Sequence, residues 1–247
     1  MKQLFYHIGR YTAFIRGLLT KPEKFAIYRT QIIKEMVSIG FGSMGIVAII
    51  SVFIGAVITI QSAYNILNPF VPIYAIAIVT RDSIILEFSP TIICLVLAGK
   101  VGSSIASELG TMRVTEQIDA LEIMGINSAG YLVVPKIVAA IIILPFLVII
   151  SMFLGIAGGW IGGTTSGVIT THDFVRGLQE TFLPFNVIFA LIKTVTFSFA
   201  ITSVSSYHGF YTKGGALEVG RASTKAVVYS STVILILDYI LTQLFLA

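Results

Sequence analysis

An uncharged segment near the N-terminus decides the class of fold. It covers Met36–Thr80 and reads MVSIGFGSMGIVAIISVFIGAVITIQSAYNILNPFVPIYAIAIVT. An α-helix of roughly 20 apolar residues crosses the hydrocarbon core of a bilayer, and Ser43–Leu67 supplies such a helix. Asparagine and proline residues then interrupt the segment. We therefore expect Phe70–Val79 to be a short re-entrant or interfacial piece.

Composition extends this conclusion to the whole chain. Of its 247 residues, 56% are hydrophobic and 11% are charged, against roughly a quarter charged in soluble domains. Polar groups could not cover a water-facing surface, so lipid must solvate much of the protein. Further spans are predicted at Ile84–Ser107, Val133–Gly163, Phe185–Tyr207 and Ala226–Leu246. The sequence predicts an all-α polytopic membrane protein with about five transmembrane helices.

The first 42 residues differ in character from the rest of the chain. Seven basic residues precede the first span, and apolar residues recur among them at helical spacing. This pattern predicts an amphipathic helix that lies in the membrane surface with its apolar face buried. We therefore divide the chain into an N-terminal interfacial segment, residues 1–42, and a transmembrane domain, residues 43–247.

Lysine and arginine residues set the predicted orientation, because they accumulate on the cytoplasmic side of membrane proteins. The outside loops contain only Arg81 and Arg176 when the N-terminus is placed in the cytoplasm. The cytoplasmic segments then contain the seven N-terminal basic residues together with Lys100, Arg113, Lys136, Lys213, Arg221 and Lys225. A six-span arrangement would no longer keep the basic residues mostly on one side of the membrane, so five crossings are preferred.

A polar segment between the second and third spans is the most informative motif. It reads ELGTMRVTEQIDALEIMG from Glu108 to Gly125, and residues 111–124 have the pattern of an amphipathic helix. Gly125 is a typical C-terminal stop. The helix either lies on the cytoplasmic membrane surface or docks on a partner. Its apolar face carries Val114, Ile118, Leu121 and Met124, and the other faces carry Arg113, Glu116, Gln117, Asp119 and Glu122.

Small residues recur at intervals of four in three predicted spans. Small side chains let helix backbones approach closely in a membrane, where lipid provides no hydrophobic drive for association. The pattern favours packing within one subunit, and the sequence does not separate this from packing across a dimer. The three sets are Ser51, Gly55 and Thr59; Gly102, Ala106 and Gly110; and Gly155, Gly159 and Gly163.

The polar segment resembles the signature of the MlaE/YrbE permease family. Ala98–Gly125 reads AGKVGSSIASELGTMRVTEQIDALEIMG, and YLVVPK follows at Tyr131–Lys136. LIKTVTF (191–197), GRASTKAVVYSS (220–231) and LDYILT (237–242) are similar to the same family. Leu86 and Ser89 depart from it, because an arginine and a glycine are common there. No role of that arginine is therefore carried over to this chain.

The resemblance implies a fold, a function and a set of partners. Family members are homodimeric membrane subunits of ABC transporters that move phospholipids or related lipids. They lie in the bacterial inner membrane, with a cytoplasmic ATPase that binds ATP and Mg and a periplasmic MCE-domain carrier, and contribute to outer-membrane lipid asymmetry. Some members also use a small STAS-domain regulator. The permease itself carries no cofactor.

The same resemblance gives the segment at 111–124 a specific role. In the family, the amphipathic helix between spans two and three is the coupling helix, which seats in a groove of the ATPase. Carried over to this chain, three apolar residues would enter that groove: Val114, Ile118 and Leu121. The polar residues of the same helix would face or flank the partner, and these are Glu116, Gln117, Asp119 and Glu122.

Three predicted spans each carry one ionisable residue, namely Glu87, Lys193 and Asp238. A charge in hydrocarbon costs roughly 2.5–3.5 kcal/mol on insertion scales, so it tends to be paired or to face a cavity. Helical rise places Lys193 and Asp238 both about 12 Å from the outer side of the membrane core. We predict that these two pair, within a subunit or across a dimer, and that Glu87 lines a path for a lipid head group. A purely stabilising salt bridge is the alternative.

Other functions lack the residues they require. The chain has no G-x-x-x-x-G-K-[ST] loop, so another polypeptide must supply the energy. Its histidines have no second ligand at metal spacing, and its basic residues form no patch for nucleic acid. Its scattered polar residues form no catalytic cluster. The remaining alternative is an ATP-independent channel or secondary transporter that uses Glu87, Lys193 and Asp238 as an ion relay.

Overall fold

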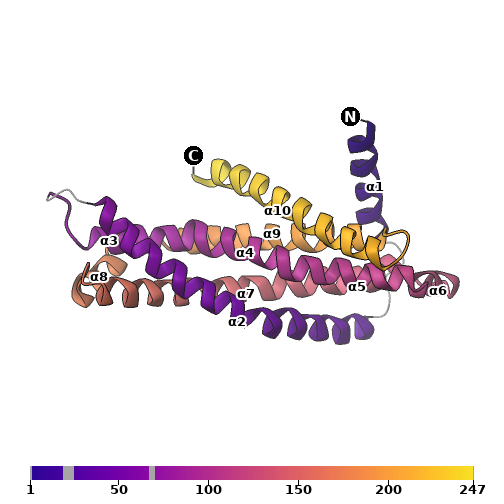
Figure 1. The fold of residues 1–247 in the computed structure, drawn as a ribbon, viewed down its shortest axis with the longest axis horizontal. Helices are drawn as coiled ribbons and strands as arrows, with labels where there is room; N and C mark the ends of the chain where they lie inside the picture. The colour runs from indigo at the N-terminus through magenta and orange to yellow at the C-terminus, as the bar shows by residue number, and fades with distance from the viewer. Residues whose placement is uncertain (1, 19–24, 67–69, 247) are drawn as a thin grey trace.

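The computed structural model describes residues 2–18, 25–66 and 70–246. These residues form helices joined by short connections, without a strand among them. Five helices are long and apolar enough to cross a membrane, and together they form an elongated bundle (Figure 1). The prediction of an all-α polytopic membrane protein is confirmed. Leu67, the predicted end of the first span, lies outside the described residues.

Four of the long helices have uninterrupted α-helical geometry. They are α2 (Phe25–Asn65), α7 (Ser128–Thr165), α9 (Pro184–Phe210) and α10 (Ala216–Leu246). The first two contain 41 and 38 residues, roughly twice the length that a bilayer requires. They therefore continue beyond the hydrocarbon core. The predicted division at residues 42 and 43 falls inside α2 and is not marked by a break in the backbone.

The second span is a composite helix that runs continuously from Ala75 to Val114. Its parts are α3 (Ala75–Ser83), π-helical η1 (Ile84–Ile92), α4 (Ile93–Leu97), η2 (Ala98–Gly102) and α5 (Ser103–Val114). A proline within a helix removes one hydrogen bond and crowds the preceding turn. The wider turn of η1 contains Pro90, consistent with that local disruption.

The start of this span differs from the sequence-based prediction. The expectation of a re-entrant piece at Phe70–Val79 is wrong for residues 75–79, which begin the spanning helix. Arg81 was assigned to an outside loop, but it is 2% exposed. Its Nη1 donates to the carbonyl oxygens of Gly177, Leu178 and Glu180. This tertiary contact allows a charged residue to lie inside the helix, which the local sequence does not reveal.

The two ends of the bundle carry different short helices. At one end lies α6 (Gln117–Ile123), and at the other lies α8 (Thr171–Gln179) beside α3 (Figure 1). We call these the α6 end and the α8 end. At the α6 end, α1 (Lys2–Leu18) rises steeply from the bundle and buries Phe14 and Leu18 in the core. Its predicted place in the membrane surface stays a prediction.

Glycines bring α2 and α7 into backbone contact. A Cβ atom added to Gly55 would overlap the carbonyl group of Gly155, and one added to Gly158 would overlap the backbone of Val52. The small residues of the second span pack instead on α9, where a Cβ on Gly209 would lie 2.9 Å from Ala106 Cα. Small-residue sets of all three spans therefore have partners within one subunit.

Gly55→Ala should lower the midpoint of thermal unfolding of the purified protein in detergent. The added methyl group would overlap the Gly155 carbonyl, and overpacking of this kind typically costs about 1–3 kcal/mol. Gly45→Ala is the matched control on the same helix, because nothing lies within 4 Å of its Cβ position. Equal midpoints for the two variants would contradict the close approach of α2 and α7.

Candidate functional site

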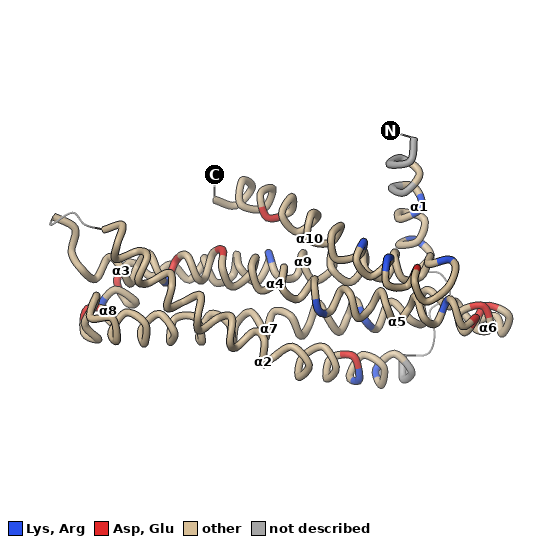
Figure 2. The backbone as a smooth tube through the Cα atoms, in the orientation of Figure 1, with Lys and Arg blue, Asp and Glu red and all other residues tan. Residues whose placement is uncertain are grey.

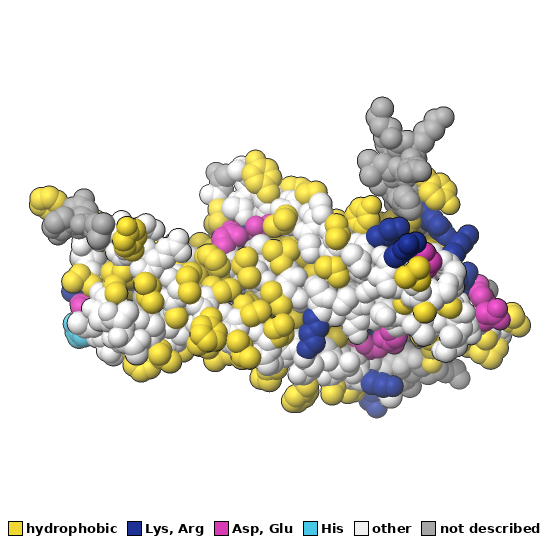
Figure 3. Space-filling view, in the orientation of Figure 1, with side chains coloured by type: hydrophobic (Ala, Val, Ile, Leu, Met, Phe, Trp, Pro, Cys, Tyr) yellow, Lys and Arg dark blue, Asp and Glu magenta, His cyan; other side chains and the backbone are white. Residues whose placement is uncertain are grey.

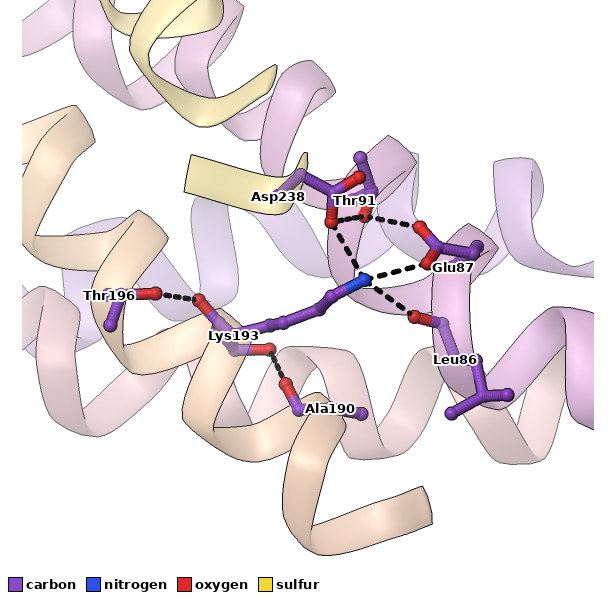
Figure 4. Close-up of polar contacts among 8 residues, drawn as sticks. Leu86, Glu87, Thr91, Ala190, Lys193, Thr196 and Asp238 are labelled. Carbon is purple, nitrogen blue, oxygen red and sulfur yellow. Dashed lines mark hydrogen bonds and ion pairs between the residues drawn. The ribbon is translucent and has the colours of Figure 1, made fainter. Parts of the chain in front are cut away.

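A buried lysine joins three spans in the apolar part of the bundle. Lys193 of α9 is fully buried, and its Nζ lies 2.7 Å from Glu87 Oε1 and 2.8 Å from Asp238 Oδ1 (Figure 4). It also donates to the carbonyl oxygen of Leu86 at 3.2 Å. The lysine and the aspartate, which the sequence places at one depth, thus contact each other within one subunit.

The three charged groups form one hydrogen-bonded cluster rather than a pair. The Thr91 hydroxyl lies 3.3 Å from Glu87 Oε2 and 3.1 Å from Asp238 Oδ1. The Lys193 ammonium also lies 4.9 Å from the centre of the Phe189 ring. Burying an ammonium is costly unless opposite charge and hydrogen bonds replace water, and this cluster provides both. One carboxylate is enough to neutralise the Lys193 charge, so the lysine would keep a partner if either carboxylate were removed.

Exposure within the cluster is uneven. The Glu87 side chain is 44% exposed and that of Asp238 is 19% exposed, whereas the lysine is closed off completely. Glu87 is therefore partly exposed at the surface of the subunit, although both of its carboxylate oxygens contact the cluster. From the sequence, Lys193 and Asp238 were predicted to pair, whereas Glu87 was predicted to line a lipid path. Helix order alone does not show that η1 packs beside α9.

A chain of serine hydroxyls anchors η1 to its neighbours on the other side. Ser51 Oγ lies 2.9 Å from Ser151 Oγ, which donates in turn to Ser89 Oγ at 3.1 Å. These residues come from α2, α7 and η1 and are all buried. In the sequence, Ser89 is distinguished only by its departure from the family pattern. Its contact with Ser151 fixes the helix segment that presents Glu87 and Thr91.

A cavity of about 900 Å³ lies between α1, α9 and α10. Basic residues lie at its α6 end, near the turn between α9 and α10, and its wall continues along both helices to Leu237, the neighbour of Asp238. His208 stacks on Tyr229 in this wall, with ring centres 5.1 Å apart. The basic residues are Arg10, Lys213, Arg221 and Lys225, and the apolar and aromatic ones include Phe199, Val204, Tyr207, Tyr211, Tyr229 and Val233.

The predicted helix at 111–124 is divided into two parts. The span helix α5 continues to Val114, and α6 begins at Gln117. Between them Glu116 has φ 61°, a left-handed conformation that is unusual for a residue with a Cβ atom. Arg113 Nη1 lies 2.6 Å from Asp119 Oδ1 across this junction. Gly125, with φ 78°, follows the end of α6 as predicted.

The exposed face of α6 differs from the predicted one. Ile118 is fully buried against its own subunit, so it is not available to enter a partner's groove as the sequence predicted. One face of α6 packs against α5 and α7, and Ile118 is buried in that contact. Val114 and Leu121 are half-buried. Ile123 and Met124 are 87% and 65% exposed, and the sequence did not single out Ile123.

The polar residues of α6 surround this apolar tip. Glu116, Gln117 and Glu122 are exposed and Asp119 is half-buried. Glu122 Oε1 also accepts a hydrogen bond of 2.8 Å from Ser128 Oγ at the start of α7. The short helix thus presents an acidic surface with an apolar tip while its rear is fixed to two spans. Among the described residues, no cluster of three or more His, Cys, Asp or Glu could hold a metal.

Five spanning helices, an amphiphilic cavity between helices and a short helix exposed at one end define a multi-pass membrane protein of the permease class. Comparison with known proteins makes this specific. The chain belongs to the family described as Permease MlaE, whose model matches residues 32–244. The match confirms the resemblance seen in the segment at 98–136.

Individual relatives agree with the family assignment. The chain is 41% identical over 238 residues to a probable ABC transporter permease protein of Rickettsia bellii, covering 96% of this chain and 92% of the relative. It is 28% identical to the intermembrane phospholipid transport system permease protein MlaE of Haemophilus influenzae, covering 97% and 92%. It is 32% identical to the chloroplastic protein TRIGALACTOSYLDIACYLGLYCEROL 1 of Arabidopsis thaliana, covering 86% and 61%. The chain is an ABC transporter permease of the MlaE family.

Removing one carboxylate from the Lys193 cluster should lower the free energy of unfolding by less than half of the loss caused by removing both. Glu87→Gln and Asp238→Asn each leave the lysine one partner. The double variant leaves a buried ammonium without a carboxylate, which typically costs about 3–5 kcal/mol. The measurement is the free energy of unfolding in a denaturant titration of the purified protein. If the loss in the double variant equalled the sum of the two single losses, the two carboxylates would not act together on Lys193.

Proposed function

We propose that this chain forms, as a homodimer, the membrane-spanning part of an ATP-driven lipid transporter. The observation that carries the proposal is the cavity between α1, α9 and α10. Its basic end suits the phosphate of a lipid head group, since Arg and Lys are the residues that bind phosphate. Its apolar wall suits acyl chains. One site therefore matches both halves of a phospholipid, the cargo named for the Haemophilus influenzae relative.

The α6 end faces the cytoplasm in this proposal, with the N-terminus on the same side. Figure 2 supports the orientation, because many lysine and arginine residues gather at the α6 end while the centre of the bundle has few charges. Hydrophobic side chains cover much of the middle in the space-filling view (Figure 3). Positive charge on the cytoplasmic side is the general rule for proteins of the inner membrane.

The helix α6 is the proposed docking point for a separate ATPase that binds ATP and Mg. Its apolar tip, Ile123 and Met124, is exposed beyond the end of the bundle, and acidic residues lie around it. An apolar anchor with a polar rim is the usual composition of a protein interface. Glu116, Gln117, Asp119 and Glu122 form that rim, while Val114 and Leu121 contribute from its edge.

The α8 end then faces the periplasm, where an MCE-domain carrier would exchange lipid with the permease. Exposed apolar residues at this end, among them Phe182 and Leu183, support a contact with a partner or with the membrane boundary. The outward face of α10 carries Leu235, Ile236 and Tyr239, which supports its use between two copies. Transport in this system would contribute to lipid asymmetry of the outer membrane, with a STAS-domain protein as a further regulator.

An ATP-independent channel is less well supported. A relay needs charged groups in succession across the membrane, but Glu87, Lys193 and Asp238 meet in one cluster with contacts of 2.7–2.8 Å. A charge held by two opposite charges is suited to joining helices or to contacting a head group through Glu87. It does not form a path by itself.

Ile123→Asp should abolish copurification of the ATPase with this chain and leave the melting temperature of the chain unchanged. The side chain is 87% exposed, so a charge there disturbs the docking surface and not the fold. Ile118→Ala is the contrasting variant, because removing a fully buried side chain lowers stability by about 2–5 kcal/mol. Normal copurification with Ile123→Asp would place the ATPase elsewhere.

The double variant Arg221→Ala, Lys225→Ala should reduce the phospholipid retained by the purified protein, measured by mass spectrometry of lipid extracts. Both residues line the cavity, where Arg221 also pairs with Glu218 at 2.6 Å. A charge-assisted hydrogen bond from either residue to a phosphate would contribute about 1.5–3 kcal/mol. Arg176→Ala, at the exposed α8 end, is the control for loss of a positive charge. Unchanged retention in the double variant would exclude the basic end of the cavity as the phosphate site.

A further inference from the structure

A second buried lysine lies toward the α6 end of the bundle. Lys136 of α7 has a side chain that is 3% exposed. Its Nζ lies 2.7 Å from Glu35 Oε1 of α2 and 2.7 Å from Glu108 Oε2 of α5. In the sequence, Lys136 ends the YLVVPK motif and is one of the basic residues that set orientation, but local sequence does not show which helices surround it.

The two carboxylates around Lys136 differ in their access to water. The Glu108 side chain is 51% exposed, whereas that of Glu35 is 23% exposed. Separating an ion pair is costly when a charge is left buried and unpaired. Glu108 can leave the lysine and be hydrated, while Glu35 keeps the buried ammonium paired. A second arrangement, in which Glu108 is hydrated and Lys136 keeps Glu35, would therefore leave the buried ammonium paired.

One of these carboxylates lies on the helix that leads into α6. Glu108 lies on α5, the helix that ends beside α6. Arg113 pairs with Asp119 across the junction, and buried Ile118 fixes the rear of α6 to its own subunit. These contacts connect α6 to the helix that carries Glu108, and the Ser128–Glu122 hydrogen bond also connects it to the start of α7.

The other carboxylate belongs to the first span. Glu35 is the only acidic residue of α2. The backbone contact of α2 with α7 at Gly55 lies about 30 Å farther along the helix at 1.5 Å rise per residue. Toward the α6 end, Lys136 thus supplies a charged connection between α2 and the stem of the coupling helix.

We propose that Lys136 is a positioning residue for transport, which links movement of α6 to the position of α2. When the ATPase displaces α6, Glu108 turns toward water and Lys136 stays with Glu35, so that α5 moves relative to α2 and α7. Return of Glu108 restores the first arrangement. The inference rests on the proposed function, because it requires a partner that acts on α6.

Glu108→Gln tests this link in the complete transporter reconstituted in phospholipid vesicles. Lys136 keeps Glu35 in this variant, so the complex should assemble. The quantity measured is lipid transferred per ATP hydrolysed, normalised to assembled complex. It should fall about fivefold or more, the lower range of coupling between distant sites, while ATP hydrolysis continues. Lys136→Arg retains both ion pairs and should retain the ratio.

Glu180→Gln is the matched control, since its side chain is 45% exposed at the opposite end of the bundle. An unchanged ratio in Glu108→Gln, or an equal fall in Glu180→Gln, would overturn the role of Lys136. A merely structural role would lower transfer and hydrolysis together and leave their ratio intact, which also overturns it. Failure of the proposed function has a different signature, because the unaltered complex would then show no ATP-dependent transfer.

Discussion

The fold depends on direct backbone contact between α2 and α7. Lipid is as apolar as the side chains it surrounds, so helices in a membrane associate through close packing and polar contacts rather than by leaving water. Gly55 and Gly155 allow this approach because neither has a Cβ atom to separate the two helices. The remaining spans are arranged around this pair, with α9 packed on α7 and α10 on α9.

Two buried lysines complete the bundle with the same electrostatic design. Lys193 and Lys136 each lie between two carboxylates that come from two other helices. One carboxylate would satisfy each charge, so the second permits rearrangement without an unpaired buried ammonium. The first cluster adjoins the cavity wall, and the second adjoins the stem of α6. Both buried lysines therefore lie where three helices meet.

These joints connect the features on which the proposed transport depends. The cavity between α1, α9 and α10 extends from basic residues to the neighbourhood of the Lys193 cluster. The exposed tip of α6 lies at the same end as those basic residues. The cluster around Lys136 joins the helix of that tip to α2. A force applied at α6 would thus reach two of the long helices that form the bundle.

The sequence by itself determined the class of fold, the number of spans and the family, because long apolar runs and the motif at 98–125 are local properties. It also placed Lys193 and Asp238 at one depth, since helical rise is constant. Only the tertiary structure showed that Glu87 contacts Lys193 as well. It also showed that Arg81 belongs to a spanning helix and is buried within the bundle, and that Ile118 faces the interior of its own subunit. Each of these depends on which helices are neighbours. Which helices are neighbours depends on contacts between segments that are far apart in the sequence, and a local pattern does not contain this information.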